Sequence, residues 1–373
     1  MNYSNNRNFG LDLIRASAIT LVVISHLSFL LFPESESSLV TFLRVLGALG
    51  VDLFFVLSGY LIGGIILKNI EQNKTSFNDL LNFWKRRWFR TLPNYFFILF
   101  VNIFIYFLVC KKLPDQLGYY FIFLQNFEHA HPNFFTEAWS LSIEEYAYLF
   151  LPLLLYAVIK YFKKNNRSQL FLYTTLVVIF ILQFFKVYYY YIVEVESYKA
   201  WSRTFRKVVL FRLDAIYIGF ILIYFVRAFP HFFKRFKGVF FVLGLIIFIL
   251  AHAIIALNNL LPESALWFYV FIYLHMVIIS FGLMFPYLTS IHFNGVFSKL
   301  VSYLSLRSYA VYLINYSIVL LSIEKFYDSR FLHFYERCFW SFIFVSATLV
   351  LSELLYRLFE KPILNYRDRK YSS

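Results

Sequence analysis

The composition of this 373-residue sequence excludes an ordinary soluble domain. Apolar residues make up 60% of it and charged residues 15%, against about 45–50% and about 25% in soluble proteins, which indicates a surface that faces lipid. The formal net charge of +14 indicates loops anchored at the cytoplasmic face of a membrane. Nucleic-acid binding would need these charges on one soluble face, and no such domain is visible.

Ten segments are apolar over roughly the 20 residues that a helix needs to cross a membrane. We therefore predict an all-α integral membrane protein, forming a single domain over 1–373 with no appended soluble domain. A stretch at 117–127 is apolar but too short to cross, and is predicted to be interfacial or re-entrant. The predicted spans are 11–32, 40–67, 93–110, 138–161, 170–192, 208–228, 238–258, 265–288, 308–324 and 338–359.

The charges of the connecting segments alternate along the chain. The segments 68–92, 163–167 and 227–237 and the C-terminal tail are basic, whereas the loop 33–38 is acidic. Basic segments stay on the cytoplasmic side, so we expect both termini there. An even number of spans requires that both termini lie on the same side of the membrane.

Two ionisable residues share the first span, where such groups are costly and indicate function. Arg15 and His26 are eleven residues apart, which places them on nearly the same face and roughly 16 Å apart along the helix. His26 is a candidate general base, because histidine titrates near neutral pH. The alternative is structural: Arg15 extends to lipid headgroups and His26 bonds a neighbouring helix.

Two further spans carry acidic residues that need partners. Asp52 in the second span requires a cation or a proton, whereas Gly59 and Gly63 form a spacing that permits close helix packing. In the sixth span, Arg212 and Asp214 are two residues apart and do not face each other on a helix. At least one of them is therefore expected to reach another helix.

The basic residues before the third span have two interpretations. Arg86 and Arg90 share a helical face, with Arg87 beside them. They are typical of a cytoplasmic anchor, but guanidinium groups also bind phosphates well, so a cofactor with several phosphates would fit.

The fourth span begins with a polar segment that includes two glutamates. Ser140 is a candidate helix cap, with Glu144 in the first turn, but this leaves Glu145 unexplained. If this end of the span lies beside His26, as the topology permits, one glutamate would orient the imidazole. No histidine has metal-ligand spacing, so no metal site is predicted.

Taken together, these segments resemble the integral-membrane acyltransferase type-3 family, which includes the O-antigen and cell-envelope polysaccharide O-acetylases. The resemblance covers about 9–362 and rests on motifs in a fixed order. These are Arg15 to His26, GVDLFFVLSGYLI (50–62), KRRWFRTLP (85–93), WSLSIEEYAYLFLPLL (139–154), FRLDAIYIG (211–219), SYAVYLIN (308–315) and FEKP (359–362).

The resemblance implies a membrane-embedded O-acyltransferase that moves an acyl group, expected to be acetyl, from cytoplasmic acetyl-CoA to a sugar hydroxyl. Under this hypothesis the donor phosphates are held by four arginines, and His26 is the general base or the acyl carrier. The donor-binding residues are then Arg15, Arg86, Arg87 and Arg90; the catalytic residues are His26, Glu144, Glu145 and Asp52; and Trp139, Ser140, Ser142, Arg212 and Asp214 belong to the site.

One departure from the family stands at Asn315, where its members often carry histidine.

The resemblance also implies the inner membrane of a bacterium and a cell-envelope or exported glycan as acceptor, with the particular glycan and the oligomeric state left open. A glycan transporter or flippase is the competing class, because buried Arg, Asp and His suit it as well. A scaffold or sensor would not need buried charges on several helices.

Overall fold

The computed structural model describes residues 7–162 and 166–370. Residues 163–165, part of the basic segment after the fourth span, lie outside the described ones. Every regular element in the described part of the chain is helical, and none is a strand.

Ten helical spans within these ranges are long and apolar enough to cross a membrane. The predicted fold class and number of spans are therefore confirmed, and the protein is a multi-pass membrane protein. The spans are α1 (Phe9–Leu31), α2 (Ser38–Glu71), α3 (Phe77–Cys110), α5 (Ala138–Tyr161), α6 (Arg167–Ile192), α8 (Val209–Ala228), α9 (Pro230–Asn258), η2 with α10 (Phe268–Leu288), α11 to α12 (Val296–Phe326) and α13 to α14 (Phe334–Lys370).

The prediction was wrong about where the third span begins. It placed the start at Pro93, but α3 begins at Phe77 behind a capping box formed by Ser76 and Asp79, and Pro93 lies inside the helix. Proline is tolerated within membrane helices because neighbouring groups satisfy the backbone that it leaves unbonded. The basic residues 85–90 are thus on a helix rather than in a loop.

Three other predicted segments were also too short, with ends predicted at 238, 308 and 359. The helices there extend to Pro230, Val296 and Lys370. In each case the added residues include charged ones, and a search for apolar residues alone stops before them. Helices longer than roughly 20 residues project beyond the hydrocarbon core.

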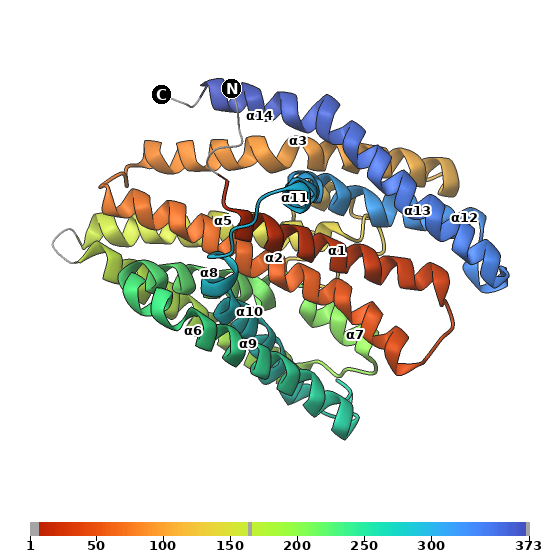
Figure 1. The fold of residues 1–373 in the computed structure, drawn as a ribbon, viewed down its shortest axis with the longest axis horizontal. Helices are drawn as coiled ribbons and strands as arrows, with labels where there is room; N and C mark the ends of the chain where they lie inside the picture. Colours follow the sequence, from red (N-terminus) through yellow and green to blue (C-terminus); the bar gives the residue numbers. More distant parts are fainter. Residues whose placement is uncertain (1–6, 163–165, 371–373) are drawn as a thin grey trace.

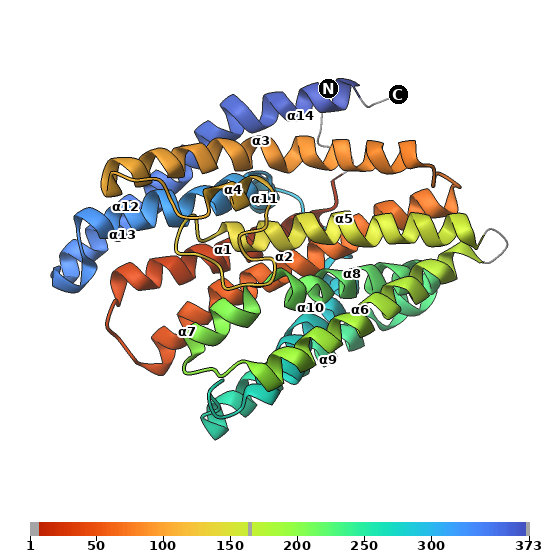
Figure 2. The ribbon, with the colours of Figure 1, turned by 180° about the vertical axis from the view of Figure 1, so that it is seen from behind.

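Helix α2 ends and α3 begins at one end of the bundle, on the left in Figure 1, and α7 (Tyr198–Trp201) and α12 (Leu321–Phe326) lie towards the other. We call these the first and the second end. Two connecting segments belong to the second end: 111–137, with the short helix α4 (Leu117–Phe121), and 193–208, with α7 and the π-helical turn η1 (Ser202–Arg206). Figure 2 shows the trace of 111–137 folded back over the helices.

Helix α2 is central and packs against α1 and α8. A β-carbon on Gly59 would lie 1.9 Å from the carbonyl oxygen of Ile216, and one on Gly219 would lie 2.7 Å from that of Val56. Only glycine allows α2 and α8 to approach so closely, which confirms the packing interpretation of Gly59. Because α2 turns this face to α8, its opposite face is left to line a cavity.

Candidate functional site

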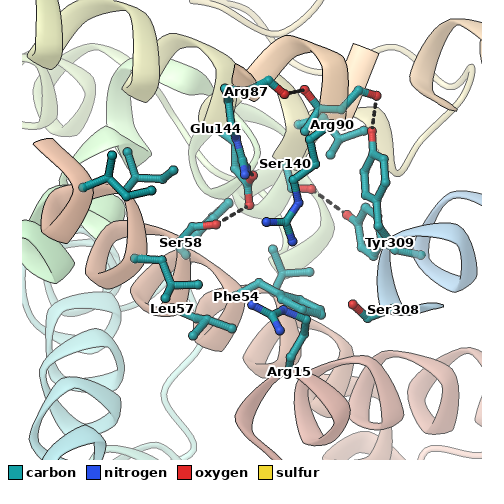
Figure 3. Close-up of a pocket in the computed structure, with 18 residues that line it drawn as sticks. Arg15, Phe54, Leu57, Ser58, Arg87, Arg90, Ser140, Glu144, Ser308 and Tyr309 are labelled. Carbon is teal, nitrogen blue, oxygen red and sulfur yellow. Dashed lines mark hydrogen bonds and ion pairs between the residues drawn. The ribbon is translucent and has the colours of Figure 1, made fainter. Parts of the chain in front are cut away.

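A cavity of about 390 Å³ lies between five spans, α1, α2, α3, α5 and α11 (Val296–Ile314). Helix α2 supplies an apolar wall that includes Phe54, Leu57 and Leu61, and the other helices supply polar groups. Figure 3 shows side chains from these separate helices converging on one space. The polar lining consists of Arg15, Ser58, Arg87, Arg90, Thr91, Ser140, Glu144, Ser308, Tyr309 and Tyr312.

On one side of the cavity, Glu144 is held by three groups. One of its oxygens accepts a hydrogen bond of 3.0 Å from Ser58, and the other accepts bonds of 3.0 Å from both Arg87 and Tyr148. The Arg87 guanidinium also stacks over the Tyr148 ring, 4.4 Å from its centre. Glu144 therefore fixes Arg87 in the wall and ties together α2, α3 and α5.

The other two arginines leave the cavity positively charged. Arg15 donates to Ser305 at 3.0 Å and lies 3.4 Å from Asp12, whose carboxylate also binds Arg7. The guanidinium of Arg90 reaches into the cavity from α3 (Figure 3), and no hydrogen bond or ion pair to it is found among the described residues. Glu360 and Glu145 lie close enough to act electrostatically on Arg90 and Arg87. The cavity wall itself carries three guanidinium groups and one carboxylate, that of Glu144, so the cavity suits an anionic ligand.

Five of the motifs found in the sequence, at 15–26, 50–62, 85–93, 139–154 and 308–315, contribute residues to this cavity. Residues 8–357 match the family described as acyltransferase domain. The chain belongs to this acyltransferase family. The ordered motifs of the sequence were therefore correctly interpreted.

Two curated relatives of this acyltransferase-family chain carry related names. The O-acetyltransferase OatA of Staphylococcus aureus (strain NCTC 8325 / PS 47) is 28% identical over 377 residues, covering 95% of this chain and 57% of the relative. The peptidoglycan O-acetyltransferase OatA of Listeria monocytogenes is 30% identical over 176 residues, covering 43% of this chain and 26% of the relative. The chain thus spans little more than half the length of the staphylococcal relative. No solved structure matches it.

His26 lies beyond the cavity, towards the second end, and its partner is Asn315. The Nδ2 group of Asn315 donates to the carbonyl oxygens of Val311 and Tyr312, at 2.7 and 2.9 Å. Its oxygen must therefore be the atom that faces Nδ1 of His26, so Nδ1 carries the proton and donates. The other imidazole nitrogen, Nε2, is left unprotonated, as a general base requires.

The expectation that Glu144 or Glu145 orients His26 is not met in the structure. Glu144 bonds to the groups already described, and Glu145 accepts a 2.8 Å hydrogen bond from Thr91 on α3. Both glutamates lie more than one turn inside α5 and face α2 and α3. Asn315, at the start of the π-helical turn η3 (Asn315–Leu320), occupies the orienting position instead.

The acidic residues of the second and sixth spans pair with buried cations. Asp52 forms an ion pair with Arg212, and Asp214 forms one with Lys186 on α6 and lies 3.0 Å from His275 on α10. The prediction that one member of the 212–214 pair reaches another helix is confirmed for both. None of these residues belongs to the cavity lining.

The remaining predicted site residues have mixed positions. Arg86 is exposed and outside the cavity lining. Ser140 shares a 2.7 Å hydrogen bond with Tyr312 across the cavity wall, Trp139 stacks beneath Arg206, and Ser142 accepts from Gln125. Among the described residues, no group of three or more His, Cys, Asp or Glu side chains could hold a metal ion.

Sequence reasoning missed several residues that complete these contacts. Asn315 was noticed only as a departure from the family pattern, and Lys186 and His275 were not singled out. Their sequence signal was weak, since a single lysine or histidine in an apolar segment does not reveal which helix it faces. The π-helical turn at Asn315 is a feature often found at functional positions, but it is not visible in the sequence.

Proposed function

We propose that this chain is a membrane O-acyltransferase that moves an acetyl group from acetyl-CoA to a hydroxyl of a cell-envelope or exported glycan in a bacterial inner membrane. The observation that carries the proposal is the positively charged cavity, lined by Arg15, Arg87 and Arg90, where five of the family's motifs meet. The names of the relatives OatA support the acetyl group and the glycan acceptor. The domain is proposed to extend over the whole sequence given.

The cavity suits the donor because CoA is both anionic and elongated. Arg15, Arg87 and Arg90 offer guanidinium groups to its phosphates, and the apolar wall of α2 offers contacts to its uncharged arm. The basic connecting segments support a first end that faces the cytoplasm, where acyl-CoA is available. The arm would then extend from the cavity towards the second end and bring the thioester to His26.

At His26 the unprotonated Nε2 accepts the proton of the acceptor hydroxyl. The hydroxyl oxygen attacks the thioester carbonyl, a C–O bond forms and the C–S bond breaks. The proton then passes from His26 to the departing CoA thiolate, which balances the reaction. Asn315 holds the imidazole in the required tautomer throughout, the task that a carboxylate performs in other catalytic pairs.

The test is transfer of labelled acetyl from acetyl-CoA to a glycan fraction, in membranes that contain comparable amounts of folded protein. We expect transfer with the wild type and with Lys85→Ala, an exposed control on α3. His26→Ala should lose roughly a hundredfold or more, the usual contribution of a general base. Full activity in His26→Ala would contradict the mechanism, and no transfer by wild type to any glycan would favour a transporter.

A further inference from the structure

The second end of the bundle contains an unusual number of buried polar atoms without partners. Unpaired buried polar groups are uncommon in folded proteins, and each needs a water, an ion or a ligand. Half of those found in the described part of the chain belong to the two segments 111–137 and 193–208. They are atoms of Gln125, Asn126, His131, Glu137, Trp201, Arg203 and Arg206.

Hydrogen bonds and charges bring these two segments together beside His26. Asn126 donates to the backbone oxygens of Trp139 and Lys207, at 3.0 and 2.7 Å. The Arg206 guanidinium lies over the Trp139 ring, 5.0 Å from its centre. Lys207 is close enough to interact electrostatically with both Glu137 and His26.

The unpartnered atoms include both donors and acceptors. Trp201, Arg203 and Arg206 contribute N–H groups, whereas the amide oxygens of Gln125 and Asn126 can only accept. His131 donates through Nδ1 to the carbonyl oxygen of Pro132 at 2.7 Å, so its buried Nε2 is an acceptor. Sugar hydroxyls donate and accept at once, and thus match a mixed lining of this kind.

One stretch of this region, 199–207, is strongly basic. Lys199, Arg203, Arg206 and Lys207 lie within nine residues, and none of them takes part in an ion pair found in the described part of the chain. Arg206 is 9% exposed, and one of its terminal nitrogens has no partner. Glu137 is the carboxylate that acts on Lys207, whereas the unpartnered nitrogens of Arg203 and Arg206 can still bind an anion that comes from outside the chain.

We propose that these two segments form the acceptor site, and that Arg203, Arg206 and Lys207 bind the acid group of an anionic saccharide while its hydroxyl reaches His26. This inference rests on the proposed function and adds a class of substrate to it. The acid group is a carboxylate or a phosphate, because guanidinium groups bind both. Aromatic rings of Trp139 and Trp201 would flank the sugar.

The test compares three probe saccharides. The first is a tetrasaccharide of alternating N-acetylglucosamine and glucuronic acid, the second is its carboxyl-reduced neutral counterpart, and the third is an N-acetylglucosamine tetrasaccharide that bears 6-phosphate. Each is measured as acceptor, by kcat/KM with acetyl-CoA, and as ligand without donor, by tryptophan fluorescence. Wild type is expected to prefer at least one acidic probe over the neutral one by roughly tenfold, as one charge-assisted contact provides.

Arg203→Gln and Lys207→Gln should each remove most of that preference, because kcat/KM falls further for the acidic probe than for the neutral one. Lys112→Gln, an exposed lysine at the same end, makes the same change of charge and should have no effect. The proposal is overturned if wild type shows the same kcat/KM and the same binding for acidic and neutral probes, in which case water molecules satisfy the hydrogen bonds of these polar groups. Preferential binding without any transfer would instead contradict the proposed function and leave the site standing, and whichever acid is preferred identifies the group.

Discussion

Among the charges within the membrane-spanning helices, two groups differ in balance. Between α2, α6 and α8, each cation meets a carboxylate: Arg212 pairs with Asp52 and Lys186 with Asp214, all four at most 3% exposed in their side chains. Around the cavity, Arg15 and Arg87 pair with Asp12 and Glu144, whereas Arg90 makes no ion pair found among the described residues and has only the electrostatic influence of Glu360. One group is closed to ligands, whereas the other is open and carries excess charge.

The difference separates residues that hold the fold from residues that bind a ligand. A balanced pair in a dry interior satisfies its own electrostatics and gives little net stability compared with apolar residues of the same shape. An unbalanced cation in a cavity needs an anion from elsewhere. Buried charge alone therefore does not identify a functional residue. What identifies it is whether the protein supplies an opposite charge to balance it.

The largest expected effect is on stability, at the balanced pair. Arg212→Met leaves the Asp52 carboxylate buried without a cation, and should destabilise the protein by about 3–5 kcal/mol. Thermal unfolding in detergent would measure this as a lower midpoint.

The double variant Arg212→Met with Asp52→Leu is the matched control for this effect. Removal of both charges should restore most of the lost stability, since no unpaired charge remains. If acetyl transfer also returns in the double variant, Asp52 is not catalytic, contrary to the expectation from its sequence. A double variant as unstable as the single one would show that the pair does more than neutralise charge.

A substitution in the cavity should have the opposite pattern of effects, with donor binding changed and stability kept. Arg90→Ala removes a guanidinium that has no partner in the wall, so the unfolding midpoint should change little. The KM for acetyl-CoA should rise roughly 10- to 100-fold, because one charge-assisted contact to the donor is lost. Initial rates across a range of donor concentrations would measure it, and a shift in stability with unchanged KM would place Arg90 with the structural charges.

A smaller effect is expected at the residue that orients His26. Asn315→Leu removes the acceptor for Nδ1–H, frees the imidazole to adopt the wrong tautomer, and should lower kcat about tenfold, the low end for loss of an orienting partner. Asn315→Asp keeps an acceptor in place and should retain more activity than Asn315→Leu. Equal losses in both variants would indicate that Asn315 acts only in packing.

The sequence predicted the helical class and the number of spans because both follow from apolar length. It also predicted the family, and several of the motifs that carried this prediction meet at the cavity. It failed where the answer depended on how helices face each other. The glutamates of α5 were expected beside His26, but they bond to Ser58, Arg87 and Thr91 on α2 and α3.

The proposed acceptor site should depend on pH near neutrality. Burial raises the pKa of Glu137 to about 7, and burial together with Arg206 and Arg203 lowers the pKa of Lys207 to about 7. Below pH 7 Glu137 is uncharged and Lys207 is positive; above pH 7 Glu137 is negative and Lys207 loses its charge. Lys199 and the hydroxyl of Ser317 are the other polar groups that act on this pair.

The site therefore becomes less positive as the pH rises. Between pH 6 and pH 8 the KM for an acidic acceptor should increase by about fivefold, the upper end for partly exposed charge pairs. The KM for a neutral acceptor should not change over the same range. Lys207→Arg keeps its charge and should flatten the increase, whereas the same rise for both acceptors would point to titration elsewhere.

The smallest expected effect separates the prediction made from the sequence from the one made from the structure. Arg86, Arg87 and Arg90 form one basic cluster in the sequence, and a clamp built from all three predicts similar losses for each. In the structure, Arg87 and Arg90 line the cavity, whereas Arg86, one helical turn before Arg90, does not. Arg86→Ala should thus leave the KM for acetyl-CoA within about twofold of wild type, as for most exposed positions. A rise equal to that of Arg90→Ala would mean that the donor extends out of the cavity and along the outer surface of α3.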